Sequence, residues 1–540
     1  MADDKEQNAG ASTKETMDDS KDHNALSDNP PVSAFANMSR GQCIRKFWRL
    51  YGAGLIVSLG GMYVGYSGAV IGNIVANEGF INQFATVTDP DTGEPALKSS
   101  HLSLWTAINF VSQIIMQLVS PITADRFGRK FNLWALMLLL VLAIILHIVS
   151  KEWIGILMSR FVSGLAGGLI GTSVMVYMSE IAMPQFRGAL LGSFSLSYAL
   201  GQLFSAVGLQ VLEETARLKF RNIFYSEFVF CGLWAVPLIL LPESPAWYAA
   251  RGRHEDAKKS LRKLVGNVAG YDVDHEYKVL RFEVEQSVAL AKTETENIWR
   301  VMFKKINLKR IVISQLPFTF QNFVGVPLFF NYTTYFFSLA NVDDPFLANL
   351  IIQLVLLFGI TISFYLVDKI GRRTLVVYGG GLLAIICFVM GGLGFLPEST
   401  SAGPALVAVS ALWTFIYALS MAPIGWISLV EISSPHLRAK TTAMAAIIQS
   451  CTGILFNYTV PLMLSNQEAG WGQKTGLFFG GIATLYLIPC ILFYPETKGR
   501  TYQELDELFE RRIPAWKFAA TVTAYQAEVE NQQGRVEAQA

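Results

Sequence analysis

The sequence predicts an all-α membrane protein of twelve transmembrane helices, arranged as two pseudo-symmetric six-helix bundles with short cytoplasmic helices. The 540-residue chain is 52% apolar and only 16% charged, with a mean hydropathy of +0.37, whereas soluble domains carry about 25% charged residues. Apolar runs of about 20 residues recur along the chain, and each is long enough to cross a bilayer. Three motifs also occur twice in the same order, which indicates an internal duplication.

Composition and residue spacing exclude several other classes of protein. The formal net charge of +1 argues against a nucleic-acid-binding protein that works through bulk positive charge. The five cysteines include no C-x-x-C pair, and the six histidines are scattered without the spacing of metal ligands. We therefore expect no metal, no cofactor and no enzymatic activity, and the expected partners are the lipid bilayer and a small-molecule solute.

The N-terminal segment, residues 1–45, is polar and rich in acidic side chains. Such a segment buries too little apolar surface to fold, so we predict a disordered cytoplasmic tail. It also lacks the apolar stretch of a cleavable signal peptide, so the first span is expected to direct insertion.

Six apolar runs follow in residues 46–241, and six more in residues 310–494. Each run is expected to be helical, because unsatisfied backbone groups in lipid cost several kcal/mol. The predicted spans are 50–72, 102–124, 131–150, 153–177, 188–210, 223–241, 310–337, 346–367, 374–396, 404–430, 439–463 and 474–494.

Two polar segments flank the second set of runs. Residues 242–309 carry several basic side chains with Leu261, Leu264 and Val265 interleaved, which predicts short amphipathic helices at the membrane face. Residues 495–540 are predicted to form a cytoplasmic tail with a short charged helix over Arg500–Arg512.

The basic residues predict the orientation in the membrane. Every second connection between spans is rich in Lys and Arg, and such connections stay in the cytoplasm. Both termini are therefore predicted to be cytoplasmic. One connection disagrees, because Arg217, Lys219 and Arg221 fall in a predicted outside loop.

The duplicated motifs place acids and bases together at the cytoplasmic corners. The first copies comprise Asp125, Arg126, Gly128, Arg129, Glu180, Arg187 and Glu243, and the second copies comprise Asp368, Gly371, Arg372, Glu431, Arg438 and Glu496. We expect Glu180 to receive Arg129 and Glu431 to receive Arg372. Arg187 and Arg438 are expected to pair with other carboxylates, including Glu243 and Glu496.

Two interpretations of these motifs remain open. The first is a cytoplasmic latch between the two halves, which holds when the site faces outward and parts when it faces inward. The second is a topology signal that also stabilises the fold. The latch is favoured, because a topology signal requires neither the acids nor their spacing.

At these motifs the chain resembles the sugar porter family of the major facilitator superfamily. The resemblance extends over residues 48–510 and includes Pro242-Glu243-Ser244-Pro245, Pro495-Glu496-Thr497-Lys498-Gly499 and Arg160 with the glycines that follow it. The run Gln321-Asn322-Phe323, followed by Tyr332, is similar to the fungal α-glucoside (maltose) permease branch. The resemblance implies a fungal sugar transporter with a polar site between the halves.

The resemblance places the expected substrate-binding residues on three spans: Gln321, Asn322, Asn331, Tyr332, Trp426 and Gln449. Neutral amides donate to and accept from hydroxyl groups, and indole offers a flat apolar face with one donor. The alternative for the amides is ordinary hydrogen bonding between helices. The pattern departs from the family where Pro327 replaces the last amide and Ser195 replaces a usual glutamine, which leaves a thinner polar site.

The coupling mechanism depends on charges within the spans. Arg160 lies inside span 4 and requires a partner. Proton-coupled relatives often carry an aspartate just after Gly-Tyr in the first span, where this chain has Ser67 after Gly65-Tyr66. This favours facilitated diffusion, with proton symport through another carboxylate such as Glu227 as the alternative.

We therefore predict a transporter that moves a sugar or sugar-like solute by alternating access, acting as a monomer in the plasma membrane. A permease for a quinate-type acid or a fungal secondary metabolite is the alternative within transport, and a nutrient sensor on the same fold is a minor one.

Overall fold

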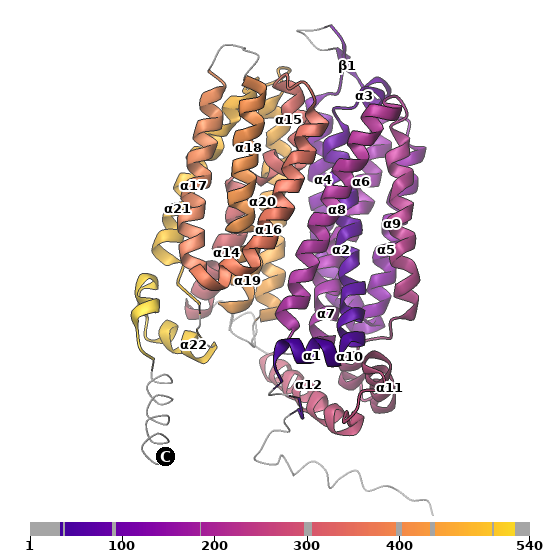
Figure 1. Ribbon diagram of the computed structural model, residues 1–540, viewed down its shortest axis with the longest axis vertical. Coiled ribbons are helices and arrows are strands. Elements are labelled where there is room, and N and C mark those ends of the chain that lie inside the picture. Colours follow the sequence, from indigo (N-terminus) through magenta and orange to yellow (C-terminus); the bar gives the residue numbers. More distant parts are fainter. Residues whose placement is uncertain are drawn as a thin grey trace, which may run out of the picture.

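The computed structural model describes residues 33–35, 38–88, 93–183, 185–295, 305–395, 402–432, 438–498, 500 and 502–523. Its helices form two bundles that stand side by side, with further helices at one end (Figure 1). The predicted residues 1–32 of the N-terminal tail and 524–540 of the C-terminal tail lie outside the described residues.

The first bundle contains the spans predicted before residue 242. Its helices are α2 (Trp48–Ile74), α4 (Ser99–Phe127), α5 (Arg129–Val149), α6 (Trp153–Leu169), the π-helical turn η2 (Ile170–Val174), α7 (Met175–Ile181), α8 (Arg187–Ala216) and α9 (Arg221–Leu240). The segments α6, η2 and α7 together form span 4.

The second bundle contains the spans predicted after residue 309. Its helices are α14 (Lys305–Phe323), the π-helical turn η3 (Pro327–Asn331), α15 (Thr333–Leu339), α16 (Pro345–Ile370), α17 (Arg372–Leu393), α18 (Ala402–Leu419), α19 (Met421–Glu431), α20 (Arg438–Leu464), the 3-10 turn η4 (Gly472–Lys474) and α21 (Thr475–Phe493). Within the described residues, ten helical stretches are long and apolar enough to cross a membrane. Spans 4 and 7, which are interrupted, complete the predicted twelve.

Span 7 is interrupted by its own sequence. Gly325 adopts a φ of +103°, which L side chains rarely adopt, and Pro327 lacks an N–H and cannot continue the hydrogen bonding of α14. Span 10 divides at Ser420, between α18 and α19. Irregular backbone at this depth is tolerated where protein surrounds it, and both breaks lie beside the polar residues of the candidate site.

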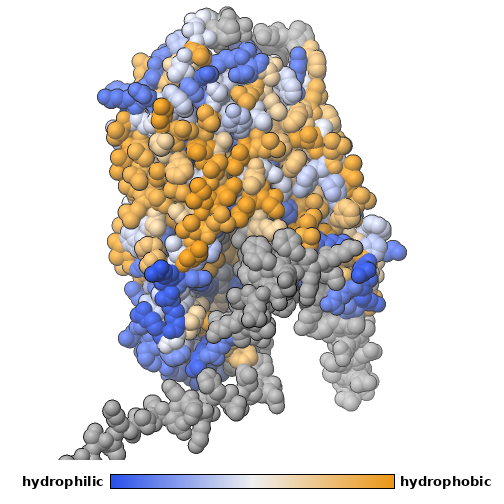
Figure 2. All heavy atoms as spheres, turned by 180° about the vertical axis from the view of Figure 1, so that it is seen from behind, coloured by the Kyte–Doolittle hydropathy of each residue, from blue (hydrophilic) through white to orange (hydrophobic). Residues whose placement is uncertain are grey.

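An apolar belt surrounds the molecule. Figure 2 shows a broad hydrophobic band between hydrophilic ends. The long apolar helices expose many apolar side chains, among them Ile122, Leu138, Val236 and Phe358. A soluble protein rarely exposes so large an apolar surface, so the belt marks the part of the molecule that faces lipid.

A short hairpin and helix cover the outer end of the first bundle. Helix α3 (Glu78–Phe84) precedes strand β1 (Val87–Thr88), which pairs antiparallel with β2 (Pro95–Ala96) so that Val87 faces Ala96. Phe80 and Phe84 pack against Trp105 and Phe220, which fixes α3 on the spans below it.

The polar segment after α9 forms the predicted cytoplasmic helices. They are α10 (Pro245–Ala250), α11 (His254–Val265) and α12 (Val273–Thr295), and they lie together at the lower end of the first bundle (Figure 1). After α21, helix α22 (Tyr502–Glu510) and the 3-10 turn η5 (Ala515–Ala520) lie at the same end of the molecule.

The prediction of a disordered N-terminal tail was wrong for the last residues of that tail. Residues up to 45 were expected to be disordered, but α1 (Arg40–Lys46) is helical. Phe35 is buried and packs edge-on against Phe47, with ring centroids 5.1 Å apart, and stacks on Tyr271 at 5.9 Å. The rings of Phe35, Phe47 and Tyr271 bury one another, and this burial orders a segment whose own composition is polar.

The basic residues in the predicted outside loop have structural partners. Arg217 pairs with Glu213 at 2.7 Å and Glu78 at 3.1 Å. The Arg221 guanidinium donates to the carbonyls of Ile148 at 2.9 Å and Ser150 at 3.0 Å. A cation at the carbonyl end of α5 also interacts favourably with the helix dipole. These contacts account for two of the three exceptions to the charge rule.

We expect Arg221→Gln to destabilise the protein, because charge-assisted hydrogen bonds contribute about 1.5–3 kcal/mol each. The measurement is the apparent melting temperature of the purified protein in detergent. The matched control is Lys219→Gln, which removes the same charge from an exposed side chain. Equal melting temperatures for the two variants would contradict this account of Arg221.

Candidate functional site

Gln321 lies at the inner side of the second bundle, near the end of α14, and is only 8% exposed. Its side-chain oxygen accepts a hydrogen bond from the Tyr417 hydroxyl at 2.8 Å. Its amide nitrogen donates to the carbonyl of Met421 at 3.4 Å, just after the break in span 10. Helix α19 approaches so closely that a side chain at Gly425 would collide with the Gln321 amide. The break in span 10 and Gly425 together position the Gln321 amide.

Asn322 and Gln449 form a second polar contact between α14 and α20. The Asn322 amide donates to the Thr452 hydroxyl at 2.7 Å and to the backbone carbonyl of Gln449 at 3.3 Å. Within the described residues, the Gln449 side-chain oxygen is buried and accepts no hydrogen bond. A buried acceptor without a donor costs about 1–3 kcal/mol, so this oxygen is suited to a hydroxyl supplied from outside the chain.

Asn331 and Tyr332 lie elsewhere, at the outer contact between the halves. The Asn331 amide donates to the Asn457 side chain at 2.6 Å. The Tyr332 hydroxyl lies 2.6 Å from the Thr106 hydroxyl of the first half and 2.9 Å from the carbonyl of Asn457. The Tyr332 side chain therefore joins the two halves, whereas the Asn331 side chain is paired within its own half, and contact with substrate stays a prediction for both.

Further cross-half contacts lie at the same end. The Asn73 oxygen accepts from the backbone and hydroxyl of Thr334, at 3.2 and 2.8 Å. Gln467 accepts from Ser99 at 3.3 Å, and Gln210 donates to Asp344 at 3.0 Å. At the cytoplasmic end, by contrast, the motif ion pairs described below each stay within one half. Among the described residues, most of the cross-half hydrogen bonds therefore lie at the end that is predicted to face outward.

Three predicted residues have side chains outside the described part of the structure: Asp368, Trp426 and Arg438. The backbone of Trp426 lies in α19, next to Gly425, and contact of its indole with substrate stays a prediction.

The first bundle buries a charged pair in its core. Arg160 is 6% exposed, and its Nε donates to the carbonyl of Trp105 at 3.4 Å. Glu227 is fully buried, lies within electrostatic range of Arg160, and has the Ser67 hydroxyl nearby. Neither oxygen of Glu227 accepts a hydrogen bond of ordinary geometry from any described residue. The only buried acid near Arg160 in the described residues is thus on α9, not on α2.

The motif residues of the first half form the expected cytoplasmic cluster. Arg129 pairs with Glu180 at 3.0 Å, and the second oxygen of Glu180 accepts from the Ser244 hydroxyl at 2.5 Å. The Glu243 carboxylate accepts from the backbone N–H groups of Arg129 at 2.9 Å and Lys130 at 3.0 Å. It therefore caps the amino end of α5. Burial raises the pKa of Glu243, and these N–H donors act in the opposite direction.

The second half repeats this arrangement with the corresponding residues. Arg372 pairs with Glu431 at 3.0 Å, and Glu431 accepts from the Thr497 hydroxyl at 2.6 Å. Glu496 accepts from the backbone N–H groups of Arg372 and Arg373, at 2.9 and 3.0 Å, at the start of α17. The duplication is thus preserved in three dimensions.

One expected contact is absent. Glu243 was expected to pair with Arg187, but the exposed Arg187 side chain instead donates to the carbonyl of Ala182 at 3.4 Å. The backbone N–H groups of α5 already occupy the Glu243 carboxylate. Asp125 pairs with Arg129 at 3.1 Å, and the exposed Arg126 lies over the Phe127 ring at 5.6 Å.

Sequence reasoning missed the hydroxyl partners of the amides, Tyr417 and Thr452. It also missed Thr106, Asn73 and Thr334 at the outer contact. They are neutral polar residues within mainly apolar spans, and polarity inside a span is the only signal that would have found them.

Two helical bundles joined by hydrogen bonds at one end, with neutral amides inside the spans, are typical of a solute transporter. A family model described as "Sugar (and other) transporter" matches residues 53–509, and the chain belongs to this family. Its expected membership of the major facilitator superfamily and its expected nature as a transporter, not an enzyme, are confirmed.

Curated relatives match over nearly the whole chain. A general alpha-glucoside permease of Saccharomyces cerevisiae is 27% identical over 513 residues, which cover 92% of this chain and 82% of the relative. A high-affinity glucose transporter of Kluyveromyces lactis is 26% identical over 512 residues, with 89% of each chain covered.

Solved structures share the fold. The xylose transporter XylE of E. coli, in a partially occluded inward-open conformation, superposes with a TM-score of 0.67 at 22% identity, and the match covers 84% of this chain and all of XylE. The predicted fold of two six-helix bundles is therefore confirmed.

We expect Gly128→Ala to destabilise the protein, because Gly128 has a φ of +108° and a Cβ there would collide with the Glu243 carboxylate. With a ψ of +163°, Gly128 lies in a backbone region that is essentially restricted to glycine, and this conformation costs another residue about 1–3 kcal/mol. The control is Gly232→Ala in α9, where an added Cβ meets nothing within 4 Å and helix propensity favours alanine. In thermal unfolding, Gly128→Ala should lower the apparent melting temperature and Gly232→Ala should raise it. An unchanged melting temperature for Gly128→Ala would contradict the close fit of Gly128 against the Glu243 carboxylate.

Proposed function

We propose that this transporter carries a sugar or sugar-like solute across the plasma membrane by alternating access, with both termini in the cytoplasm. The observation that carries the proposal is the group of uncharged amides inside the second bundle, Gln321, Asn322 and Gln449, of which the Gln449 side-chain oxygen is buried without a donor among the described residues. Their donors and acceptors suit a ligand rich in hydroxyl groups. The names of the relatives, which include glucose and alpha-glucoside carriers, support the same class of solute.

A neutral solute fits these residues better than an acid. The side chains that contact the amides are Tyr417 and Thr452, both of which are neutral. Arg160 lies in the other bundle, and its Nε is directed to a backbone carbonyl. A quinate-type acid would require a cation that faces it, so this alternative receives less support.

The cytoplasmic motifs fit a latch that parts in this conformation. Arg129 and Arg372 each pair within their own half, while several hydrogen bonds join the halves at the opposite end and one more joins Gln117 to Ser450 within the spans at 3.4 Å. The proposal is that reversal of the carrier opens the outer contacts and brings the two corners together. An exchange of this kind needs only contacts of about 1 kcal/mol each.

Facilitated diffusion is proposed as the mechanism, because Ser67 cannot titrate at physiological pH. Glu227 favours a second candidate, proton symport. A buried carboxylate beside an arginine, with no hydrogen-bond donor of good geometry among the described residues, is the kind of intramembrane acid that takes up and releases protons.

Uptake assays test the substrate and the site together. Radiolabelled glucose and maltose are supplied to yeast that lack their own hexose carriers and express this chain or Gln449→Leu. Loss of one hydrogen-bond acceptor is expected to raise KM about 2- to 10-fold with little change in the amount of protein.

The control for this variant is Thr459→Val on the same helix, which removes a hydroxyl that donates to a carbonyl of its own helix, that of Leu455, at 2.9 Å. Wild-type uptake of neither sugar, or an unchanged KM in Gln449→Leu, would contradict the proposed site.

Proteoliposomes distinguish the two mechanisms. Under facilitated diffusion, the internal sugar concentration rises only to the external value, with or without an imposed proton gradient. Accumulation above it that depends on the gradient would overturn facilitated diffusion. In that case Glu227→Gln is expected to abolish accumulation and to preserve sugar exchange, because the glutamine keeps the size of the side chain but cannot release a proton.

A further inference from the structure

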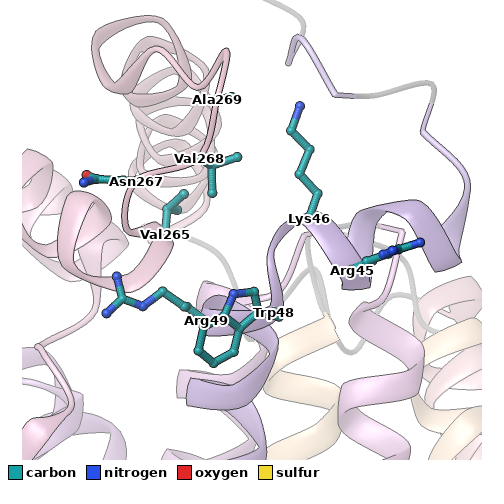
Figure 3. Close-up of a pocket in the computed structure, with 8 residues that line it drawn as sticks. All are labelled: Arg45, Lys46, Trp48, Arg49, Val265, Asn267, Val268 and Ala269. Carbon is teal, nitrogen blue, oxygen red and sulfur yellow. The ribbon is translucent and has the colours of Figure 1, made fainter.

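A cleft of about 540 Å³ lies at the cytoplasmic end of the first bundle, between the start of span 1 and the connection from α11 to α12. Its walls are Arg45, Lys46, Trp48 and Arg49 on one side and residues 265–269 on the other. Figure 3 shows Lys46 and Arg49 on either side of the opening, with Arg45 directed along α1. The cleft is remote from the amides described above and takes no part in the proposed transport site.

The cations of this cleft are not neutralised by the described part of the chain. Arg45, Lys46 and Arg49 make no ion pair with any described carboxylate. The contacts they do make are with neutral groups: Lys46 lies 4.6 Å from the centroid of the Phe35 ring, and Arg49 lies 6.0 Å from that of Trp48. Three uncompensated cations at one opening create a local positive potential that attracts an anion.

The far wall is shaped to admit Arg49. Helix α11 ends at Val265 and is followed by Gly266, whose φ of +73° turns the chain sharply. A Cβ at Gly266 would collide with the Arg49 guanidinium, so the glycine allows the arginine to lie against the connection. The aromatic contacts of Phe35 with Phe47 and Tyr271 join the same two walls. The opening is therefore a built feature of the fold.

The depth of the cleft points to a lipid. Span 1 begins at Trp48, so the three cations lie within one turn of the membrane surface. The Trp48 side chain is 67% exposed, and tryptophan in this position is typical of the headgroup region of a bilayer. Basic residues directly adjacent to a span on the cytoplasmic side attract anionic phospholipids.

We propose that this cleft binds the phosphate-bearing headgroup of an anionic phospholipid, with Lys46 and Arg49 as its principal contacts and Arg45 as a further source of positive charge. The acyl chains would extend past Trp48 into the bilayer. The lipid would then connect span 1 to the α11–α12 connection.

The test measures lipid binding to the full-length protein in detergent by native mass spectrometry, with phosphatidylinositol 4-phosphate, phosphatidylserine and phosphatidylcholine as probes. The variant is Arg45→Gln/Lys46→Gln/Arg49→Gln. The matched control is Lys259→Gln/Lys278→Gln/Lys517→Gln, which removes three positive charges from exposed cytoplasmic side chains outside the cleft.

The expected result is preferential binding of the two anionic lipids, reduced about tenfold or more in the cleft variant and less than twofold in the control. Equal losses in the two variants would show a bulk charge effect and overturn the site. Full competition by the soluble headgroup glycerophosphoinositol 4-phosphate, at the affinity of the lipid, would assign the cleft to a soluble phosphate compound and overturn the lipid.

The acidic N-terminal residues are the competing occupant within the chain. If lipid binds only after Asp18, Asp19 and Asp22 are replaced by Asn, the tail fills the cleft and the proposal fails. Sugar uptake is measured on the same variants, so that a loss of transport can be distinguished from a loss of lipid binding.

Discussion

The cytoplasmic end of each half depends on one carboxylate at the start of a helix. Glu243 and Glu496 accept the first N–H groups of α5 and α17, which lack partners within their own helices. The glycines before these helices adopt φ values near +105° and leave room for the carboxylates. The arginine that follows each glycine is thereby directed to Glu180 or Glu431. Capping, turn and ion pair form one unit, and the chain contains it twice.

Span 7 links the proposed substrate site to the outer closure. Its first part, α14, carries Gln321 and Asn322. Its second part carries Tyr332, between η3 and α15, and Thr334 in α15, which contact Thr106 and Asn73 of the other half. The break at Gly325 and Pro327 lies between them. Since hinges are residues that absorb large changes in backbone angle, this break is a suitable point for ligand contact at one end to alter closure at the other.

The sequence predicted what depends on local composition and on repetition. Hydropathy located the spans because lipid demands long apolar helices, and the repeated motifs predicted the Arg129–Glu180 and Arg372–Glu431 pairs. The sequence did not predict contacts between single residues that are far apart in the chain. Tyr417 and Thr452 have no spacing that marks them as partners of the amides, and Phe35 is buried only because Phe47 and Tyr271 happen to meet it.

The expected Arg187–Glu243 pair failed for a related reason. Charge complementarity in a sequence does not reveal that backbone N–H groups compete for the same carboxylate. Geometry decides that competition, because a helix start holds its donors in a fixed arrangement next to the acid.

The outer seal has a thermodynamic consequence. Its cross-half contacts among the described residues are hydroxyls and amides, with Asp344 as the one ionised member. Salt screens interactions between charges but has little effect on hydrogen bonds between neutral groups. The balance between open and sealed forms is therefore expected to depend little on the ionic strength of the medium that this end faces.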